Sequence, residues 1–279
     1  MRLRLRGFVL LLAAVSSLGQ ARVAVQSPED ALARARALYN ARKYDEAVAA
    51  ADAARAVPAL ANAALVVGAR ARLERYRALS QPADLADARD ALKLVYVPEL
   101  APRDRVEFLI ALGESLYLDG CAGGCLSAAA ELFEEALARS ASAAVDQREA
   151  IFEWWAISLE GVAQSALDTE RPQIYARILA KAEAEVRRPE GSATASYWLA
   201  AAARGAGHFE RAWGAAIAAW VRSRYLGARG GPLREDLDQF VIQVLLPERA
   251  RQLTPPEGDP RFLFEALVEQ WEGIKRRWG

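Results

Sequence analysis

Residues 207–219 read GHFERAWGAAIAA, a glycine turn followed by a helix with small residues along one side. Gly207 favours a turn because a residue without a Cβ atom adopts left-handed backbone angles at little cost. Ala212, Ala216 and Ala219 follow at spacings of four and three, which places them on one face of a helix. Such a small-residue stripe lets a second helix approach closely. The stretch therefore predicts a tightly packed helix–turn–helix unit.

Two further stretches repeat this arrangement of small residues. The three small-residue triads start at Ala47, Ala129 and Ala212, which lie 82 and 83 residues apart. An interval of that length has room for two helical hairpins of about 41 residues each. We therefore expect intermediate hairpins at residues 61–95 and 144–186.

Helix formers and helix breakers alternate along the chain. Alanine, the best helix former, is abundant, and no stretch alternates apolar and polar residues in the way that predicts a strand. Proline and glycine divide the sequence into segments of helical length. The sequence therefore predicts an all-α protein built from antiparallel helical hairpins.

The hairpins resemble those of the tetratricopeptide repeat (TPR) family, whose helix–turn–helix units stack into an α-solenoid. The turn at Gly207, the aromatic residue Tyr44 and the Leu112-Gly113 pair match positions in the family's motif. The resemblance implies that residues 22–228 form one TPR-like repeat domain with about five hairpins. The spacing of about 41 residues exceeds the family's usual 34, which makes the resemblance a distant one.

Residues 229–279 carry a different pattern. Two apolar stripes at helical spacing, one through Leu237 and Val241 and one through Leu267 and Trp271, are separated by a proline-containing loop. Both segments have polar residues on the opposite side, which predicts two amphipathic helices. We expect this pair to cap the same solenoid and to cover its last apolar surface.

The first 21 residues have the composition of a secretory signal peptide. Three arginines lie within the first six residues, residues 8–18 are mostly apolar, and the small residue Ala21 ends the segment. The apolar run is about half of the roughly 20 residues that anchor a protein permanently in a bilayer. The segment therefore predicts cleavage after about Ala21, with an uncleaved anchor as the alternative.

The predicted export sets the expected location. Of the 36 basic residues, only Lys43, Lys93, Lys181 and Lys275 are lysines, an arginine bias typical of GC-rich bacterial genomes. We therefore expect a periplasmic or other extracytoplasmic protein of a bacterium, with no membrane span after signal cleavage.

Composition also argues against several kinds of function. The chain has 279 residues with 36 basic and 36 acidic side chains, whereas a general nucleic-acid binder needs a basic excess. His208 is the one histidine, and it lies in a predicted turn without candidate partners for metal binding or nucleophilic catalysis. We therefore expect no catalytic residue, no metal site and no cofactor, and we do not expect an enzyme.

The TPR resemblance implies where a partner would bind. In that family the first helix of each hairpin lines a concave groove and presents exchangeable side chains to the bound segment. Projected onto this chain, those positions are Arg36, Tyr39, Asn40, Glu114, Tyr117, Tyr197 and Arg204. The predicted function is therefore an exported scaffold that binds a protein or peptide partner through a TPR-like groove.

Two alternatives remain open at this point. Trp154 and Trp155 point about 100° apart on a helix, so at least one is a candidate for exposure, although packing between helices is the simpler role. An exposed tryptophan beside Glu153 or Glu160 would suit a glycan-binding or glycan-processing protein. The second alternative is a structural subunit whose groove is filled by its own C-terminal helix.

Cys121 and Cys125 are the two cysteines, and Ala122-Gly123-Gly124 separates them. The two glycines disfavour a continuous helix, and a turn can bring the Cα atoms within the roughly 4.4–6.8 Å of a disulfide. An exported protein folds in an oxidising compartment, so we expect a Cys121–Cys125 disulfide. A redox-active pair and a metal site are the alternatives; the spacing is one residue longer than CxxC, and no histidine lies nearby.

Overall fold

The computed structural model describes residues 28–120, 124–141, 143–189 and 191–278. All regular secondary structure in these residues is helical, so the predicted all-α class is confirmed. In chain order the elements are α1 (Pro28–Asn40), α2 (Tyr44–Arg55), the 3₁₀ turn η1 (Pro58–Leu60), α3 (Ala61–Leu79), α4 (Pro82–Lys93), η2 (Val97–Glu99), α5 (Pro102–Leu118), α6 (Gly124–Arg139), α7 (Val145–Ser165), α8 (Arg171–Val186), α9 (Ala193–Gly205), α10 (Phe209–Ser223), η3 (Gly227–Arg229), α11 (Gly230–Phe240), the π-helical η4 (Val241–Leu245), α12 (Leu246–Leu253) and α13 (Pro260–Trp278).

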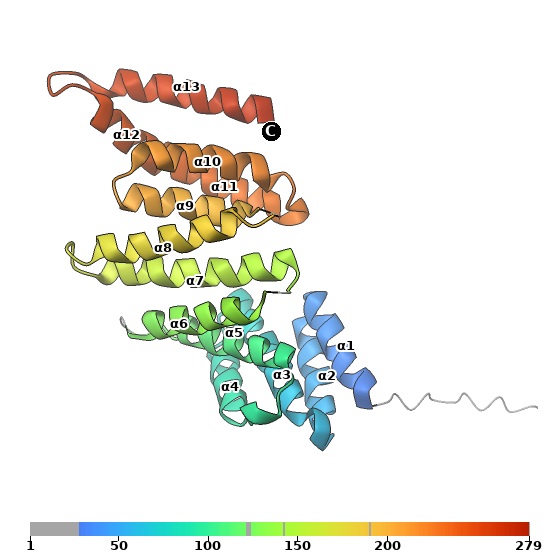
Figure 1. Cartoon of the computed structure of the whole chain (residues 1–279). Coiled ribbons are helices and arrows are strands. Elements are labelled where there is room, and N and C mark those ends of the chain that lie inside the picture. The colour runs from blue at the N-terminus through green and yellow to red at the C-terminus, as the bar shows by residue number, and fades with distance from the viewer. Residues whose placement is uncertain (1–27, 121–123, 142, 190, 279) are drawn as a thin grey trace, which may run out of the picture.

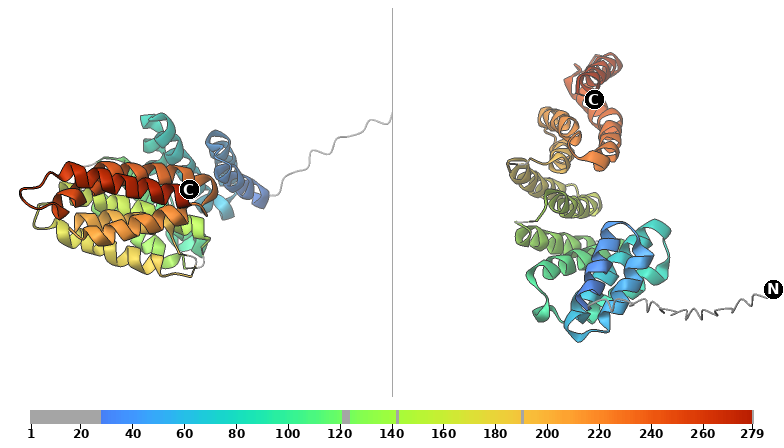
Figure 2. Two further views of the ribbon diagram at one scale, coloured as in Figure 1. Left: turned by 90° about the horizontal axis from the view of Figure 1, so that it is seen from above. Right: turned by 90° about the vertical axis from the view of Figure 1, so that its right-hand side faces the viewer.

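Helices that follow one another in the sequence pack against one another. From α5 to α13 they lie one above another, whereas α1 to α4 run steeply across them at the other end of the molecule (Figure 1). The right-hand view of Figure 2 shows the same layering, with α1 and α13 near opposite ends of the molecule, and the left-hand view looks down the stack. We call α1, α3, α5, α7, α9 and α11 the first helices, and α2, α4, α6, α8 and α10 the second helices.

The predicted small-residue positions lie where paired helices meet. All nine triad residues are at most 1% exposed: Ala47, Ala51, Ala54, Ala129, Phe133, Ala136, Ala212, Ala216 and Ala219. The approach is close at Gly113 of α5, where an added Cβ would lie 2.7 Å from the ring of Phe133 on α6. A side chain at position 113 would therefore force the third pair of helices apart.

In two turns, the residue two positions before the next helix has left-handed backbone angles. Gly207 has a φ of +78° two residues before α10 begins at Phe209, and Arg42 has a φ of +60° two residues before α2 begins at Tyr44. Glycine tolerates this conformation, whereas a residue with a Cβ atom adopts it at a cost. The turn predicted around Gly207 is therefore repeated in the first pair of helices, with arginine at the strained position.

The apolar core is divided. One large cluster extends from α5 to α13 and contains Trp155 and Trp271, which are both fully buried. A small cluster joins α1, α2 and α3 around Leu32 and Val67, and another joins α3, α4 and α5 around Leu73. The four N-terminal helices therefore rest on much smaller cores than the rest of the chain.

The C-terminal segment folds as two helical arms. The first arm comprises α11, η4 and α12, and its π-helical turn ends just before Pro247. Proline lacks an N–H donor and clashes with the carbonyl one turn earlier, which explains the local widening of the helix. The second arm, α13, packs on α12 and α10, where the Trp271 ring centroid lies 5.7 Å from that of Trp213 and 5.3 Å from that of Trp220.

Two predictions concern residues that the structure does not describe. The predicted signal peptide, residues 1–21, and Cys121 of the predicted disulfide lie outside the described residues, and both stay predictions. Among the helices that are described, none combines the length and the apolar composition needed to cross a bilayer.

Candidate binding face on the first helices

The N-terminal part of the first-helix side is organised around Arg70 of α3. Its guanidinium carbon lies 4.7 Å from the ring centroid of Tyr39 on α1. On α5, Nη1 of Arg70 pairs with Glu107, and Nη2 lies 3.8 Å from Oε1 of Glu114. Gln147 of α7 donates from Nε2 to Oε1 of Glu107 at 2.9 Å. One arginine therefore ties α1, α3 and α5 together, and Glu107 extends the contacts to α7.

The electrostatics of this cluster are unusual because Glu114 is only 1% exposed and its carboxylate charge is only partly balanced by neighbouring groups. Its Oε2 has no hydrogen-bond partner among the described residues. Burial is the main cause that raises the pKa of Glu114, to about 7, and Arg70 and Arg77 oppose it only in part. Burial also raises the pKa of Tyr39 well above its usual range, with Glu114 adding to the effect and Arg70 opposing it.

The middle of the face is centred on Trp154 of α7, which is half-buried. Tyr117 of α5 packs edge-on at 5.1 Å between ring centroids, and Phe133 of α6 stacks at 5.8 Å. The guanidinium carbon of Arg77 lies 4.9 Å from the Trp154 ring centroid, and Glu74 accepts a hydrogen bond from Arg77 at 3.0 Å. Trp154 is therefore held between aromatic neighbours and a cation from α3.

The C-terminal part of the face is centred on Tyr197 of α9, which is half-buried. Tyr197 packs edge-on against Trp198 at 5.4 Å and against Phe240 of α11 at 6.0 Å. Burial is the main cause that raises the pKa of Tyr197 to about 12, and the carboxylates of Asp236, Glu160 and Glu153 contribute to this rise in that order. Tyr197 therefore lies in an acidic part of the face, between α7 and α11.

The structure brings some of the predicted groove residues together. Tyr39 and Glu114 meet through Arg70, and Tyr117 lies in the Trp154 cluster. Glu114 does not present its carboxylate to solvent, as the projection from TPR proteins would require, because that side chain is buried behind Arg70. Tyr197 belongs to a separate cluster near the other end of the face.

The three remaining predicted residues differ in whether their side chains are free to contact a partner. Arg36 pairs with Asp104 of α5 at 2.5 Å, and Asn40 is exposed. Nε of Arg204 donates to Oε2 of Glu248 on α12 at 2.7 Å, so its guanidinium is already engaged. Arg36 and Arg204 therefore hold helices together, and Asn40 is the accessible one of these three.

Sequence reasoning missed Arg70 and Arg77, the two arginines that connect these clusters. Both belong to α3, in the second hairpin, where the motif was poorly defined. With Glu74 they fall at spacings of four and three, which places all three on one side of α3. A search for charged residues at helical spacing in each expected first helix would have found them.

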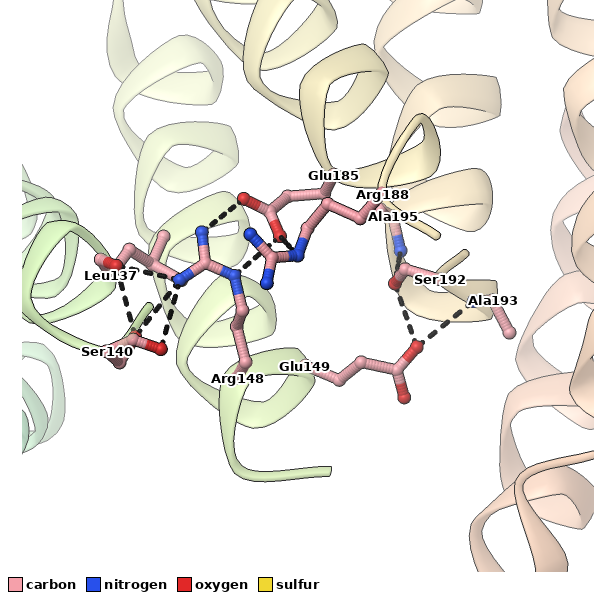
Figure 3. Close-up of polar contacts among 9 residues, drawn as sticks. All are labelled: Leu137, Ser140, Arg148, Glu149, Glu185, Arg188, Ser192, Ala193 and Ala195. Carbon is pink, nitrogen blue, oxygen red and sulfur yellow. Dashed lines mark hydrogen bonds and ion pairs between the residues drawn. The ribbon is translucent and has the colours of Figure 1, made fainter. Parts of the chain in front are cut away.

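A second polar site lies near the loop between α6 and α7 (Figure 3). Nη2 of Arg148 pairs with Oε1 of Glu185 on α8 at 2.5 Å, and its Nε donates to Oε2 at 2.8 Å. Nη1 of Arg148 donates to the carbonyl oxygen of Leu137 at 2.8 Å. The buried carboxylate of Glu149 accepts from the Ser192 hydroxyl at 2.8 Å and from the Ala193 amide at 3.1 Å.

This polar site joins three helix pairs rather than offering free groups. Arg148 connects α6, α7 and α8, and Glu149 connects α7 to the start of α9. Because the buried charges are paired and hydrogen-bonded, the arrangement fixes how successive pairs pack. We therefore assign it a structural role.

Two hollows occur elsewhere on the surface. One of about 120 Å³ adjoins the Arg148 site and is lined by Ala141, Ala143, Val145, Arg148, Glu149, Phe152, Glu185, Arg188, Gly191 and Ser192. The other, of about 210 Å³, lies among α2, α3 and α4 and is lined by Asp52, Arg55, Ala64, Leu65, Arg72, Asp87, Asp90, Ala91 and Leu94. None of the seven predicted groove residues lines either of these two hollows.

The tryptophans offer little exposed aromatic surface for a sugar. Five are buried: Trp155, Trp198, Trp213, Trp220 and Trp271. Trp154 is half-buried beneath Arg77, and Trp278 is 39% exposed near the end of the chain. Neither of the two adjacent tryptophans is exposed: Trp155 is fully buried, and the Arg77 guanidinium lies over the ring of the half-buried Trp154.

His208 is exposed in the turn before α10. Within the described ranges, no three His, Cys, Asp or Glu side chains are placed so as to hold a metal ion. No family model, curated protein or solved structure matches this chain, so the interpretation of the face rests on its own geometry.

Proposed function

We propose that the chain is an exported scaffold that binds a protein or peptide partner along the face of its first helices. The observation that carries the proposal is the row of half-buried aromatic residues on these helices: Tyr39, Tyr117, Trp154, Tyr197 and Phe240. Charged side chains accompany the rings from α1 to α11. Aromatic residues and arginine are enriched in protein interfaces because they combine large contact areas with hydrogen-bonding groups.

The helix contacts support a TPR-like solenoid with the first helices on its inner side. Each first helix contacts the next one, from α1 through α3, α5, α7 and α9 to α11. Consecutive second helices make fewer such contacts with one another within the described residues. A stack in which one layer is more closely spaced than the other curves toward the closer layer, as superhelices of helix pairs do.

An extended partner fits this face better than a small molecule does. The aromatic residues of the row lie on five helices from α1 to α11, and none of them lines either of the hollows described above. Small-molecule sites are concave and cover most of the ligand surface, whereas a polypeptide gains affinity from anchors along its length. The alternative of a structural subunit whose groove is filled by its own C-terminal helix, α13, has no support at the N-terminal end of the face. There α13 is absent, because it lies at the opposite end of the molecule (Figure 1).

Site-specific photo-cross-linking in the native host tests the proposal. A photoreactive amino acid is placed at Asn40, Gln164 or Gln239, which are exposed on α1, α7 and α11. Matched controls carry it at Glu131 and Ala180, which are exposed on the second helices α6 and α8. We expect one partner, identified by mass spectrometry, to be cross-linked from the first three positions and not from the controls.

The cross-linked partner is then purified and mixed with the purified chain, so that binding is shown with two defined components. Equal cross-linking from the control positions, or no cross-linked protein from any of the three face positions, would contradict the proposal. The mass of the secreted chain tests the export step, because signal cleavage predicts an N-terminus near Arg22.

A further inference from the structure

Two aromatic residues of the first-helix face each have an arginine guanidinium over the ring. The guanidinium of Arg70 lies over Tyr39, and that of Arg77 lies over Trp154, at 4.7 and 4.9 Å from the ring centroids. Each guanidinium also pairs with a carboxylate, Arg70 with Glu107 and Arg77 with Glu74. The face therefore twice repeats one arrangement, in which a guanidinium is placed between an aromatic ring and an acid.

Tyr197 repeats the aromatic and acidic parts of this arrangement. The charged groups that act on its hydroxyl are the carboxylates of Glu153 and Glu160 on α7 and of Asp236 on α11. No cation lies over the Tyr197 ring among the residues that the structure describes, in contrast to Tyr39 and Trp154. The third position therefore has the ring and the acids without the guanidinium.

The carboxylates around Tyr197 are not neutralised by ion pairs. None of Glu153, Glu160 and Asp236 has a basic nitrogen within 4.0 Å in the described parts of the chain, and Glu153 and Asp236 are exposed. Arg229, whose charge acts on Glu153, is engaged by Glu149 at 3.3 Å and by the carbonyl oxygen of Asp146 at 3.3 Å. The negative charge of Glu153 and Asp236 is therefore accessible to a partner, whereas the half-buried Glu160 already accepts hydrogen bonds from Tyr175 at 3.3 Å and Gln164 at 3.4 Å.

The acids come from the two helices that flank Tyr197. Glu153 and Glu160 are seven residues apart and share one side of α7, and α9 contacts both α7 and α11. Although Glu153 is exposed as a whole residue, partial burial of its carboxyl group is the main cause that raises its pKa. The carboxylates of Asp236 and Glu149 add to the rise, and Arg229 and Arg77 oppose it. A cation placed among these acids would offset the repulsion between the carboxylates.

We propose that an arginine side chain of the bound partner occupies the face of Tyr197, between the carboxylates of α7 and of Asp236. The inference rests on the proposed function and names the chemistry of the partner segment. Arginine fits better than lysine because its planar guanidinium stacks on a ring while it donates hydrogen bonds to carboxylates at its edge. Arginine also supplies the cation in both internal examples.

A pair of synthetic peptides tests the inference on the mature chain. The first probe is the acetylated, amidated heptapeptide GLRGLRG, and the second replaces both arginines by citrulline, which has nearly the same shape without the charge. Binding is followed by nuclear magnetic resonance of the isotope-labelled protein, which identifies the amides that shift. We expect the arginine peptide to shift amides of α7, α9 and α11 around Tyr197, and the citrulline peptide to bind on the order of tenfold more weakly.

Variants separate this site from general attraction to an acidic surface. The double variant Glu153→Gln/Asp236→Asn should weaken the arginine peptide on the order of tenfold. The control Glu131→Gln/Glu135→Gln removes the same charge from the exposed side of α6 and should change its affinity by less than about twofold. Tyr197→Leu should weaken binding by about two- to fivefold, whereas Tyr197→Phe, which keeps the ring, should not.

Equal binding of the two peptides, or equal losses in the two double variants, would overturn the inference. Circular dichroism of each variant checks that the helices are retained. The inference and the proposed function fail in different ways. If the cross-linked partner binds the double variant Glu153→Gln/Asp236→Asn with unchanged affinity, the arginine site is refuted and the scaffold stands. If no face position cross-links a partner, the scaffold is refuted.

Discussion

Arg70 and Glu114 form an incomplete ion pair: Nη2 of the arginine lies 3.8 Å from Oε1 of the buried glutamate, and Oε2 has no hydrogen-bond partner within the described residues. Burial raises the pKa of Glu114 from its ordinary 4.5 to about 7. The folded chain therefore binds this proton more tightly than the unfolded chain does. The resulting stabilisation is complete below about pH 4.5 and is lost as the pH rises through about 7.

Glu114→Gln should remove this pH dependence, because glutamine keeps the shape of the side chain without the ionisable group. Between about pH 4.5 and about pH 8, the unfolding free energy of the variant should rise by about 3 kcal/mol relative to the natural chain. Thermal and urea unfolding, followed by helical circular dichroism at several pH values, measure the difference. Glu135→Gln, at an exposed site on α6, is the control and should show no such trend; a pH-independent difference for Glu114→Gln would contradict the prediction.

Arg148→Ala should strongly destabilise the chain because it leaves the buried Glu185 carboxylate without its bidentate partner. We expect a loss of about 3–5 kcal/mol of unfolding free energy, measured in urea. Arg139→Ala is the matched control, since its pair with Glu135 is exposed, and it should cost about 0.2–1 kcal/mol. The double variant Arg148→Ala/Glu185→Ala should lose less than the sum of the single variants. Additive losses would show that the two side chains are not coupled.

Arg42→Gly should stabilise the first pair of helices because Arg42 occupies a left-handed conformation with a φ of +60°. The expected gain is about 0.5–1 kcal/mol, since the greater freedom of glycine in the unfolded chain offsets part of the relief. The reciprocal change, Gly207→Arg, should cost about 1–2 kcal/mol, because the backbone is strained although a Cβ at position 207 meets no atom within 4 Å. Thermal midpoints that move in the same direction for both variants would refute the conclusion that Arg42 and Gly207 occupy equivalent left-handed positions.

The predicted Cys121–Cys125 disulfide should make the exported protein resistant to alkylation under non-reducing conditions. Mass spectrometry after treatment with iodoacetamide should find no modified cysteine before reduction and two after it. Because the closed loop is short, the variant Cys121→Ser/Cys125→Ser should lose only about 1–2 kcal/mol of unfolding free energy. Two alkylated thiols in the unreduced exported protein would refute the bond.

The sequence predicted the local structure better than the contacts between distant residues. Helix pairing follows from short-range signals, such as the turn at Gly207 and the triad that starts at Ala212, and the structure confirms the burial of these small residues. These signals are readable because turn conformation and helical spacing depend on neighbouring residues. The relation of Tyr39 to Arg70 depends instead on how one helix pair turns against the next.

Even so, some of these distant contacts have a regular spacing. Arg70 with Glu107 and Arg148 with Glu185 are each separated by 37 residues, about one helix pair. A search for opposite charges one repeat apart would have identified both pairs. The burial of Glu114 had no such signal, because a glutamate on a first helix is equally compatible with a solvent-facing position.

The division of the apolar core has a consequence for cooperativity. The large cluster from α5 to α13 joins many helices, whereas the clusters around Leu32 and Leu73 each hold only a few buried side chains. In stacked helical arrays, local stability follows the contacts between neighbouring units, so weakly joined end units open first. Amide hydrogens in α1 and α2 should therefore exchange faster than those in α7 to α10. A partner that bridges both regions would make the whole chain open as one unit.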